Sequence, residues 1–176
     1  MTDRLRIVIG SDDAGFTYKE ALKAGLEASD LVESVVDVGV DADGHTGYPT
    51  VAIAAAEKVA AGEADRALLV CGTGIGVAIA ANKVEGIRCA LAWSDETAAL
   101  AREHNDANVV SVGGRMHPLD DMTRFVEIFL TTPFSGDERH VRRIAQLSTY
   151  DGGGGLPPLP ESARVPQNPD LPGADA

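Results

Sequence analysis

The chain has 176 residues, of which 44% are hydrophobic and 24% charged, the balance of one globular domain rather than of a disordered chain. Its formal net charge of -12 argues against a nucleic-acid or membrane partner, because anionic surfaces bind dense cationic faces. The longest uncharged stretch, residues 67–82, is interrupted by glycines and is too short to span a bilayer, and no signal-peptide core precedes it. We therefore expect a cytoplasmic protein.

Apolar runs bounded by turn residues predict five strands, at residues 5–10, 35–39, 67–71, 88–92 and 109–113. Segments with helical spacing predict helices at residues 18–28, 50–61, 75–83, 96–104, 119–130 and 138–146. Such alternation builds a parallel sheet covered by helices on both faces. The sequence therefore predicts an α/β fold, with a single three-layer α/β/α domain and a five-stranded parallel Rossmann-like sheet.

The composition changes after residue 150. Residues 151–176 hold six of the nine prolines, a run of four glycines and almost no large apolar side chains. Such a segment has no pattern that could form a core. We expect residues 1–150 to form the folded domain and residues 151–176 to be a Gly/Pro-rich disordered tail.

The carboxyl ends of the predicted strands lead into turns where ligands bind in open parallel sheets. This edge of the sheet would gather residues 11–16, 72–76, 93–95 and 114–118. Cys71 ends the third strand, and Gly72, Gly74 and Gly76 open the next helix. Backbone N–H groups of such a turn can hold an oxyanion or phosphate, and the amino end of a helix favours a thiolate. A small core thiol before an ordinary glycine turn explains the same pattern.

Basic and thiol residues elsewhere are less specific. His104 follows a predicted helix, where it either caps that helix or serves a site. Arg139 and Arg143 share one helix face, which suits phosphate binding but also suits a solvated turn paired with acids. Cys71 and Cys89 do not form a CxxC pair, so both are expected to be free thiols. Residues 10–15 hold only two glycines, which argues against NAD.

Seven motifs occur together and in order: GSDDAGF at residues 10–16, YP at 48–49, CGTGIGVAIAANK at 71–83, GIRCALAW at 86–93, AREHNDANV at 101–109, GGRMH at 113–117 and RHVRRI at 139–144. With these motifs, residues 6–144 resemble the ribose-5-phosphate isomerase B family, which includes galactose- and allose-phosphate isomerases. The cysteine-glycine turn followed by AANK, together with HND, is the most specific part of the resemblance.

The resemblance implies an aldose–ketose isomerase of a phosphorylated sugar, without metal or cofactor, that works through a cis-enediolate. It implies that Cys71 takes the C2 proton, that Thr73 shuttles protons between the enediolate hydroxyls, and that His104 with Asp12 assists opening of the furanose ring. Substrate contacts are implied for Asp13, Gly72, Gly74, Gly76, Asn105, Arg115, Arg139, His140 and Arg143. The family builds each site from two subunits, so a homodimer or homotetramer is implied.

At two positions this sequence differs from other members of the family. Family members that lack the cysteine carry a glutamate six residues later, and here that residue is Val77, so Cys71 has no local substitute. Where the family usually shows Asp-His-Ala-Gly, this chain has Asp-Asp-Ala-Gly at residues 12–15. A second carboxylate near a phosphate is repulsive unless it is paired or points away. Ribose 5-phosphate is therefore the first expected substrate, with erythrulose 4-phosphate and galactose or allose 6-phosphate left open.

Two other classes of protein would use some of the same residues. A phosphate-binding module without catalytic activity needs the glycine turn and the arginines but not Cys71, Thr73 and His104 together. A cysteine hydrolase would use Cys71 as the nucleophile and His104 as its base.

Overall fold

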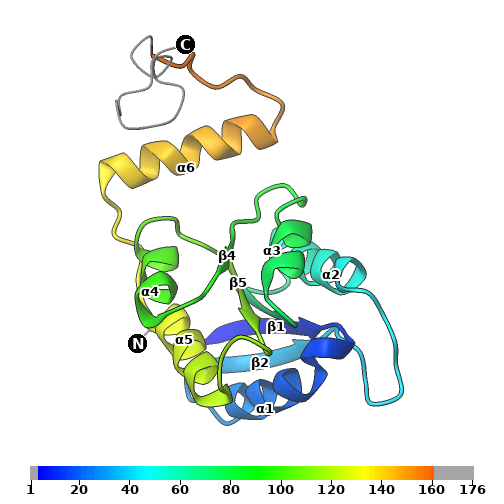
Figure 1. Ribbon diagram of the computed structural model, residues 1–176. Coiled ribbons are helices and arrows are strands. Elements are labelled where there is room, and N and C mark those ends of the chain that lie inside the picture. The colour runs from blue at the N-terminus through cyan, green and yellow to red at the C-terminus, as the bar shows by residue number, and fades with distance from the viewer. Residues whose placement is uncertain (1–3, 161–176) are drawn as a thin grey trace, which may run out of the picture.

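The computed structural model describes residues 4–160. Five parallel strands form one sheet in the order β2-β1-β3-β5-β4 (Figure 1). The strands are β1 (Leu5–Ser11), β2 (Val32–Asp37), β3 (Arg66–Cys71), β4 (Cys89–Leu91) and β5 (Val109–Gly113). The helices are α1 (Phe16–Glu27), α2 (Tyr48–Ala60), α3 (Ile75–Ala81), α4 (Asp95–Glu103), α5 (Leu119–Thr131) and α6 (Glu138–Asp151), and a short 3-10 helix (Asp13–Gly15) precedes α1. The predicted α/β fold with a five-stranded parallel sheet is confirmed.

The sheet has a separate apolar core on each face. Ile7 and Ile9 of β1 pack in a core with residues of α1, α4 and α5, whereas Val8 packs in a second core with residues of α2 and α3. Successive strand residues point to opposite faces, so a strand covered on both sides must be apolar throughout. This explains why β1, β3 and β5 consist mostly of apolar residues.

The largest differences from the predicted elements occur at the margins of the fold. Strand β2 begins at Val32, which pairs with Leu5, three residues before the predicted start. It lies at an edge of the sheet, where the exposed polar residues Glu33 and Ser34 are tolerated and hide the strand pattern. Helix α6 continues to Asp151, five residues beyond its predicted end and one residue past the expected domain boundary.

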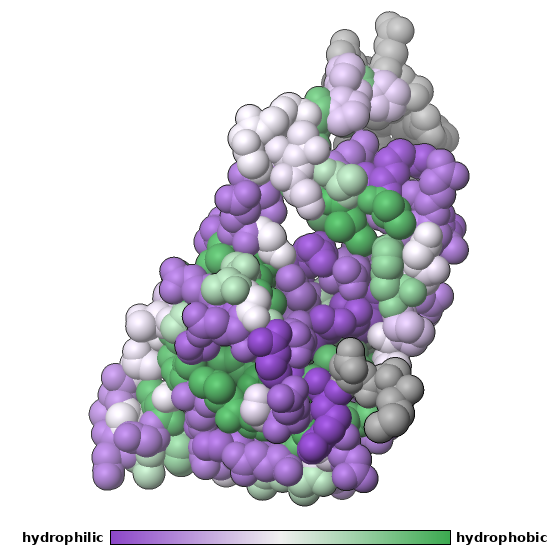
Figure 2. Space-filling model, turned by 180° about the vertical axis from the view of Figure 1, so that it is seen from behind, coloured by the Kyte–Doolittle hydropathy of each residue, from purple (hydrophilic) through white to green (hydrophobic). Residues whose placement is uncertain are grey.

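Helix α6 lies apart from the three layers and meets them only near its two ends (Figure 1). A cavity of about 400 Å³ separates its second half from β4 and the end of α3. Near the cavity, the carboxylate of Asp151 accepts a hydrogen bond from the N–H of Gly86 at 3.1 Å. Val141, Leu147 and Tyr150 of α6 remain about half exposed or more, and Figure 2 shows apolar residues beside the gap below this helix.

Beyond α6 the chain runs to residue 160 without a helix or strand. Most of the predicted disordered tail, residues 161–176, lies outside the described residues, as do residues 1–3. Among residues 4–160, no helix is both long enough and apolar enough to cross a membrane.

Candidate active site

The Cys71 side chain lies at the carboxyl end of β3, where it is 5% exposed. Its Sγ atom accepts a hydrogen bond from the N–H of Gly74 at 3.1 Å. Gly74 has a φ of 78°, and a Cβ there would lie 2.5 Å from Cδ1 of Leu91, so both the backbone and the packing require glycine. The turn therefore holds the sulfur against the first residues of α3.

Two further polar groups share this edge of the sheet. The hydroxyl of Thr73 accepts a hydrogen bond from the N–H of Ile75 at 3.3 Å. The guanidinium of Arg115 covers Gly72, because a Cβ on that glycine would lie 3.2 Å from Cζ of the arginine. The N–H of Arg115 also donates to the carbonyl of Gly72 at 2.9 Å. A thiol, a hydroxyl and a fixed positive charge are thus adjacent, as the sequence predicted for Cys71, Thr73 and Arg115.

Strand β1 ends at the same edge and supplies the two carboxylates of the DDAG motif. The Asp12 side chain caps the short 3-10 helix by accepting the N–H of Gly15 at 3.1 Å. A Cβ on Gly15 would lie 2.5 Å from the carbonyl oxygen of Val70, so this helix lies directly against the end of β3. Asp12 is therefore close to the cysteine turn, and its carboxylate already accepts the hydrogen bond that caps the 3-10 helix.

Asp13 points into the loop that precedes α2. Its carboxylate contacts Nδ1 of His45 at 3.0 Å and accepts the N–H of Thr46 at 3.1 Å. The hydrogen bond with His45 is the main reason that the pKa of Asp13 lies below its ordinary value. The same loop reaches the ring of Tyr48, which packs over Gly76 at the start of α3. The segment 45–48 therefore connects the DDAG motif with the end of the cysteine turn.

A second group of predicted site residues lies where α4 meets the start of α6. The rings of His104 and His140 are 4.3 Å apart between centroids. His140 is 3% exposed, and its Nδ1 atom lies 2.8 Å from the hydroxyl of Ser135. Burial, and then the neighbouring His104, lower the pKa of His140. Arg139 and Arg143 flank it on the exposed face of α6.

The two groups lie at opposite ends of the strands. The Cys71 group lies at the carboxyl ends, and the His104 group lies near the amino ends. Cys71 pairs with Gly113 at the carboxyl end of β5, whereas Asn105 is bound by Arg88, which precedes β4. The five residues of β5 separate these ends by about 15 Å, at roughly 3.3 Å per residue. One chain therefore does not bring His104 next to Asp12, and their predicted joint action on a sugar ring requires a second copy.

The structure adds residues that the sequence did not single out. His45 and Ser135 each contact a predicted site residue, and Arg88 binds the backbone of the HND motif. The sequence around each of the three residues gave no indication of these contacts, because each contact joins separate segments of the chain. His140 was expected to contact the substrate. In the structure it is buried and packs against His104, and its contact with the substrate stays a prediction. No group of three potential metal ligands is present among residues 4–160.

The fold and the residues at the carboxyl ends of β3 and β5 define a class of protein. It is an open parallel α/β protein in which a thiol before one glycine turn lies beside an arginine of another. Residues 7–147 match the family model described as Ribose/Galactose Isomerase. The chain belongs to this family, which confirms the resemblance seen in its motifs.

Individual relatives agree with the family match. D-erythrulose-4-phosphate isomerase 2 of Mycolicibacterium smegmatis is 50% identical over 84% of this chain and 98% of that protein. Ribose-5-phosphate isomerase B of Mycolicibacterium paratuberculosis is 45% identical over 89% of this chain and 98% of that protein. The solved type B ribose 5-phosphate isomerase of Trypanosoma cruzi superposes with a TM-score of 0.82 at 41% identity, covering 86% and 99% of the two chains.

Proposed function

We propose that this protein interconverts ribose 5-phosphate and ribulose 5-phosphate. The observation that carries the proposal is the position of Cys71, whose sulfur accepts the N–H of Gly74 and whose carbonyl accepts the N–H of Gly114, next to Arg115. Relatives named as ribose-5-phosphate isomerase B, 41–45% identical to the chain, support this substrate.

The chemistry follows from the groups at this edge. Cys71, as the thiolate, removes the proton from C2 of the open-chain aldose, and the C2–H electron pair becomes the double bond of a cis-enediolate. The carbonyl oxygen at C1 gains a proton from the hydroxyl of Thr73, which takes one in turn from the hydroxyl at C2. The thiol then returns its proton to C1, which completes the ketose without a net change in the enzyme. The backbone N–H groups of the glycine turn can hold the developing negative oxygen, and Arg115 is assigned to the phosphate.

The proposed site is completed by a second copy of the chain, in a homodimer or homotetramer. His104 assists ring opening, Asn105 holds sugar hydroxyls, and the arginines of α6 bind the phosphate. Support comes from the separation of the two groups within one chain and from the half-exposed apolar residues of α6. An oligomer would cover these residues and bring the second group to the Cys71 of its partner.

Erythrulose 4-phosphate is the second candidate substrate. It is favoured by one relative at 50% identity and by the carboxylate of Asp13 at the place where the family usually has a histidine. Galactose 6-phosphate is supported only by the name of the family, and allose 6-phosphate only by the resemblance of the motifs.

The experiment that tests the proposal is a panel of phosphorylated aldoses and ketoses assayed for interconversion with a chelator present. Turnover of ribose 5-phosphate above that of the tetrose and hexose phosphates supports the proposed substrate. Phosphate binding without turnover would indicate a binding module, and a burst of acyl-enzyme with activated esters would indicate a cysteine hydrolase. The cytoplasmic location stays a prediction from the sequence.

A further inference from the structure

The chain makes an unusual corner directly after α4. Asp106 has a φ of 44°, in the left-handed region that residues other than glycine seldom adopt. The corner directly follows His104 and Asn105 in the HND motif. A left-handed aspartate persists only where surrounding contacts hold it.

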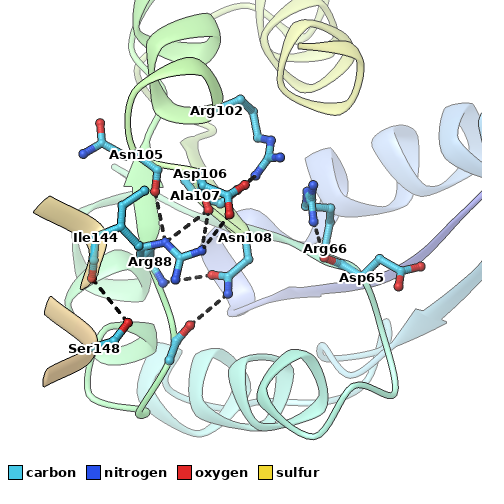
Figure 3. Close-up of polar contacts among 11 residues, drawn as sticks. Asp65, Arg66, Arg88, Arg102, Asn105, Asp106, Ala107, Asn108, Ile144 and Ser148 are labelled. Carbon is cyan, nitrogen blue, oxygen red and sulfur yellow. Dashed lines mark hydrogen bonds and ion pairs between the residues drawn. The ribbon is translucent and has the colours of Figure 1, made fainter. Parts of the chain in front are cut away.

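Arg88 supplies one set of these contacts. Its Nε donates to the carbonyl oxygen of Asn105 at 3.0 Å, and its Nη2 donates to the carbonyl oxygen of Asp106 at 2.7 Å. Nη2 also lies 3.2 Å from Oδ2 of Asp106. A single guanidinium therefore binds two successive carbonyls and one carboxylate of the corner (Figure 3). Arg88 is fixed in turn, because Asn108 accepts its N–H at 2.9 Å.

Arg102 holds the same carboxylate from the other side. Its Nη1 lies 2.8 Å from Oδ1 of Asp106 and donates to the carbonyl oxygen of Ala107 at 2.6 Å. Arg102 is 5% exposed, whereas the side chain of Asp106 is 36% exposed, so only the arginine side of the ion pair is removed from water. Burial, and then the charge of Arg102, lower the pKa of nearby Arg66. The corner is thus crowded with positive charge, and Asp106 supplies the carboxylate that bridges two of its arginines.

The network uses the backbone of the corner and leaves the functional side chains free. The amide of Asn105 points away from the arginines (Figure 3) and lines the cavity beside α6. The ring of His104 lies against that of His140, tilted by 39°. A backbone held in one conformation can keep the side chains of His104 and Asn105 in the orientation that a substrate requires.

We propose that Asp106 and Arg88 are positioning residues that fix the direction of His104 and Asn105. This inference rests on the proposed function, in which both side chains act on the sugar. The two arginine contacts hold the left-handed conformation, and that conformation sets where the imidazole and the amide stand relative to the partner's Cys71 turn.

The test compares three variants of the full-length protein with wild type: Asp106→Ala, Asp106→Asn and Arg88→Lys. Alanine loses both the carboxylate and the tolerance of the left-handed region, so kcat for ribose 5-phosphate should fall by about ten- to a hundredfold as His104 is displaced, and KM should rise as Asn105 is displaced. Asparagine tolerates that region and keeps an acceptor, so it should retain more activity than alanine. Lysine cannot bind two carbonyls and a carboxylate at once, so Arg88→Lys should lower kcat about as much as Asp106→Ala does.

A matched control separates positioning from stability. Arg6 and Asp65 form a similar pair at 2.7 Å, in which the carboxylate of Asp65 pairs with Arg6 and not with Arg88 or Arg102. Asp65→Asn should lower the melting temperature without lowering kcat. If kcat in the Asp106 and Arg88 variants falls no further than in Asp65→Asn, the network only stabilises the fold and the inference is wrong.

A second readout does not depend on activity. The chain has four histidines, so their imidazole Cε1–H resonances can be assigned by single replacements. The His104 resonance should shift or broaden in Asp106→Ala, while that of His117, which contacts Trp93 at the opposite edge, should not. An unchanged His104 resonance would overturn the inference even if the enzyme is active. A wild type without isomerase activity would contradict the proposed function while this measurement still tests the corner.

Discussion

The carboxylate of Asp13 lies 3.0 Å from Nδ1 of His45, although 32 residues separate the two in the sequence. Both side chains are exposed beside the edge that carries Cys71. The pair places an ionised carboxylate where the family usually has a histidine, and it ties that carboxylate to the loop before α2. The substrate preference of this chain is therefore expected to depend on Asp13.

Replacing Asp13 by histidine should improve the use of ribose 5-phosphate. The change exchanges an anion for a hydrogen-bond donor near the phosphate, so KM should fall for this sugar. Steady-state kinetics on both sugars provide the measurement. His45→Ala is the control, since it removes the partner but keeps the carboxylate and should not lower KM for ribose 5-phosphate. Unchanged kinetics on both sugars would place Asp13 outside the site.

His104→Ala should separate ring opening from proton transfer. Ribose 5-phosphate closes to a furanose, whereas a tetrose phosphate cannot close a five-membered ring once its terminal oxygen is esterified. The loss in kcat/KM should reach about a hundredfold or more for ribose 5-phosphate and should be clearly smaller for erythrulose 4-phosphate. Equal losses on the two substrates would show that His104 has another role.

Gly74→Ala should damage both the fold and the site. The left-handed backbone and the 2.5 Å approach to Leu91 should lower the free energy of unfolding by about 1 to 3 kcal/mol and should displace the N–H that binds Cys71. Gly25→Ala is a matched control inside α1, where a Cβ meets nothing within 4 Å, so it should raise stability by about 0.5 to 1 kcal/mol. Urea unfolding compares the two, and a Gly74→Ala protein as stable and active as wild type would remove the reason given for this glycine.

The stability of the fold should decrease as the pH falls through the titration of His140. Burial and His104 lower its pKa in the folded state, so below an ordinary value of about 6.5 the unfolded chain binds a proton that the folded chain does not. The contribution is fully present above about pH 6.5 and is lost as the pH falls toward the lower folded value. Urea unfolding of wild type and His140→Gln at several pH values measures this. The variant should show a shallower dependence between pH 7 and pH 5, and equal slopes would contradict the assignment.

The sequence predicted the parts of the molecule that are encoded by neighbouring residues. Strand β5 has its predicted bounds because all five of its residues are buried, and the Cys71 turn was recognisable because its three glycines lie within six residues of the chain. The contacts of Asp13 with His45 and of His104 with His140 were not predicted, because they join distant segments and leave no periodic signal. The same reason applies to Arg88, whose partners Asn105 and Asp106 are reached only through the fold.

The central claim is that Cys71 removes the C2 proton, and loss of the C2–H signal of ribose 5-phosphate in D₂O, followed by proton NMR, tests it most directly. Cys89 is the matched thiol, because burial raises its pKa to about 12 and keeps it protonated at neutral pH. Wild type and Cys89→Ala should remove the signal at similar rates, whereas Cys71→Ala should leave it at the rate of buffer while still binding the sugar. A Cys71→Ala protein that removes the signal as fast as wild type would contradict the account.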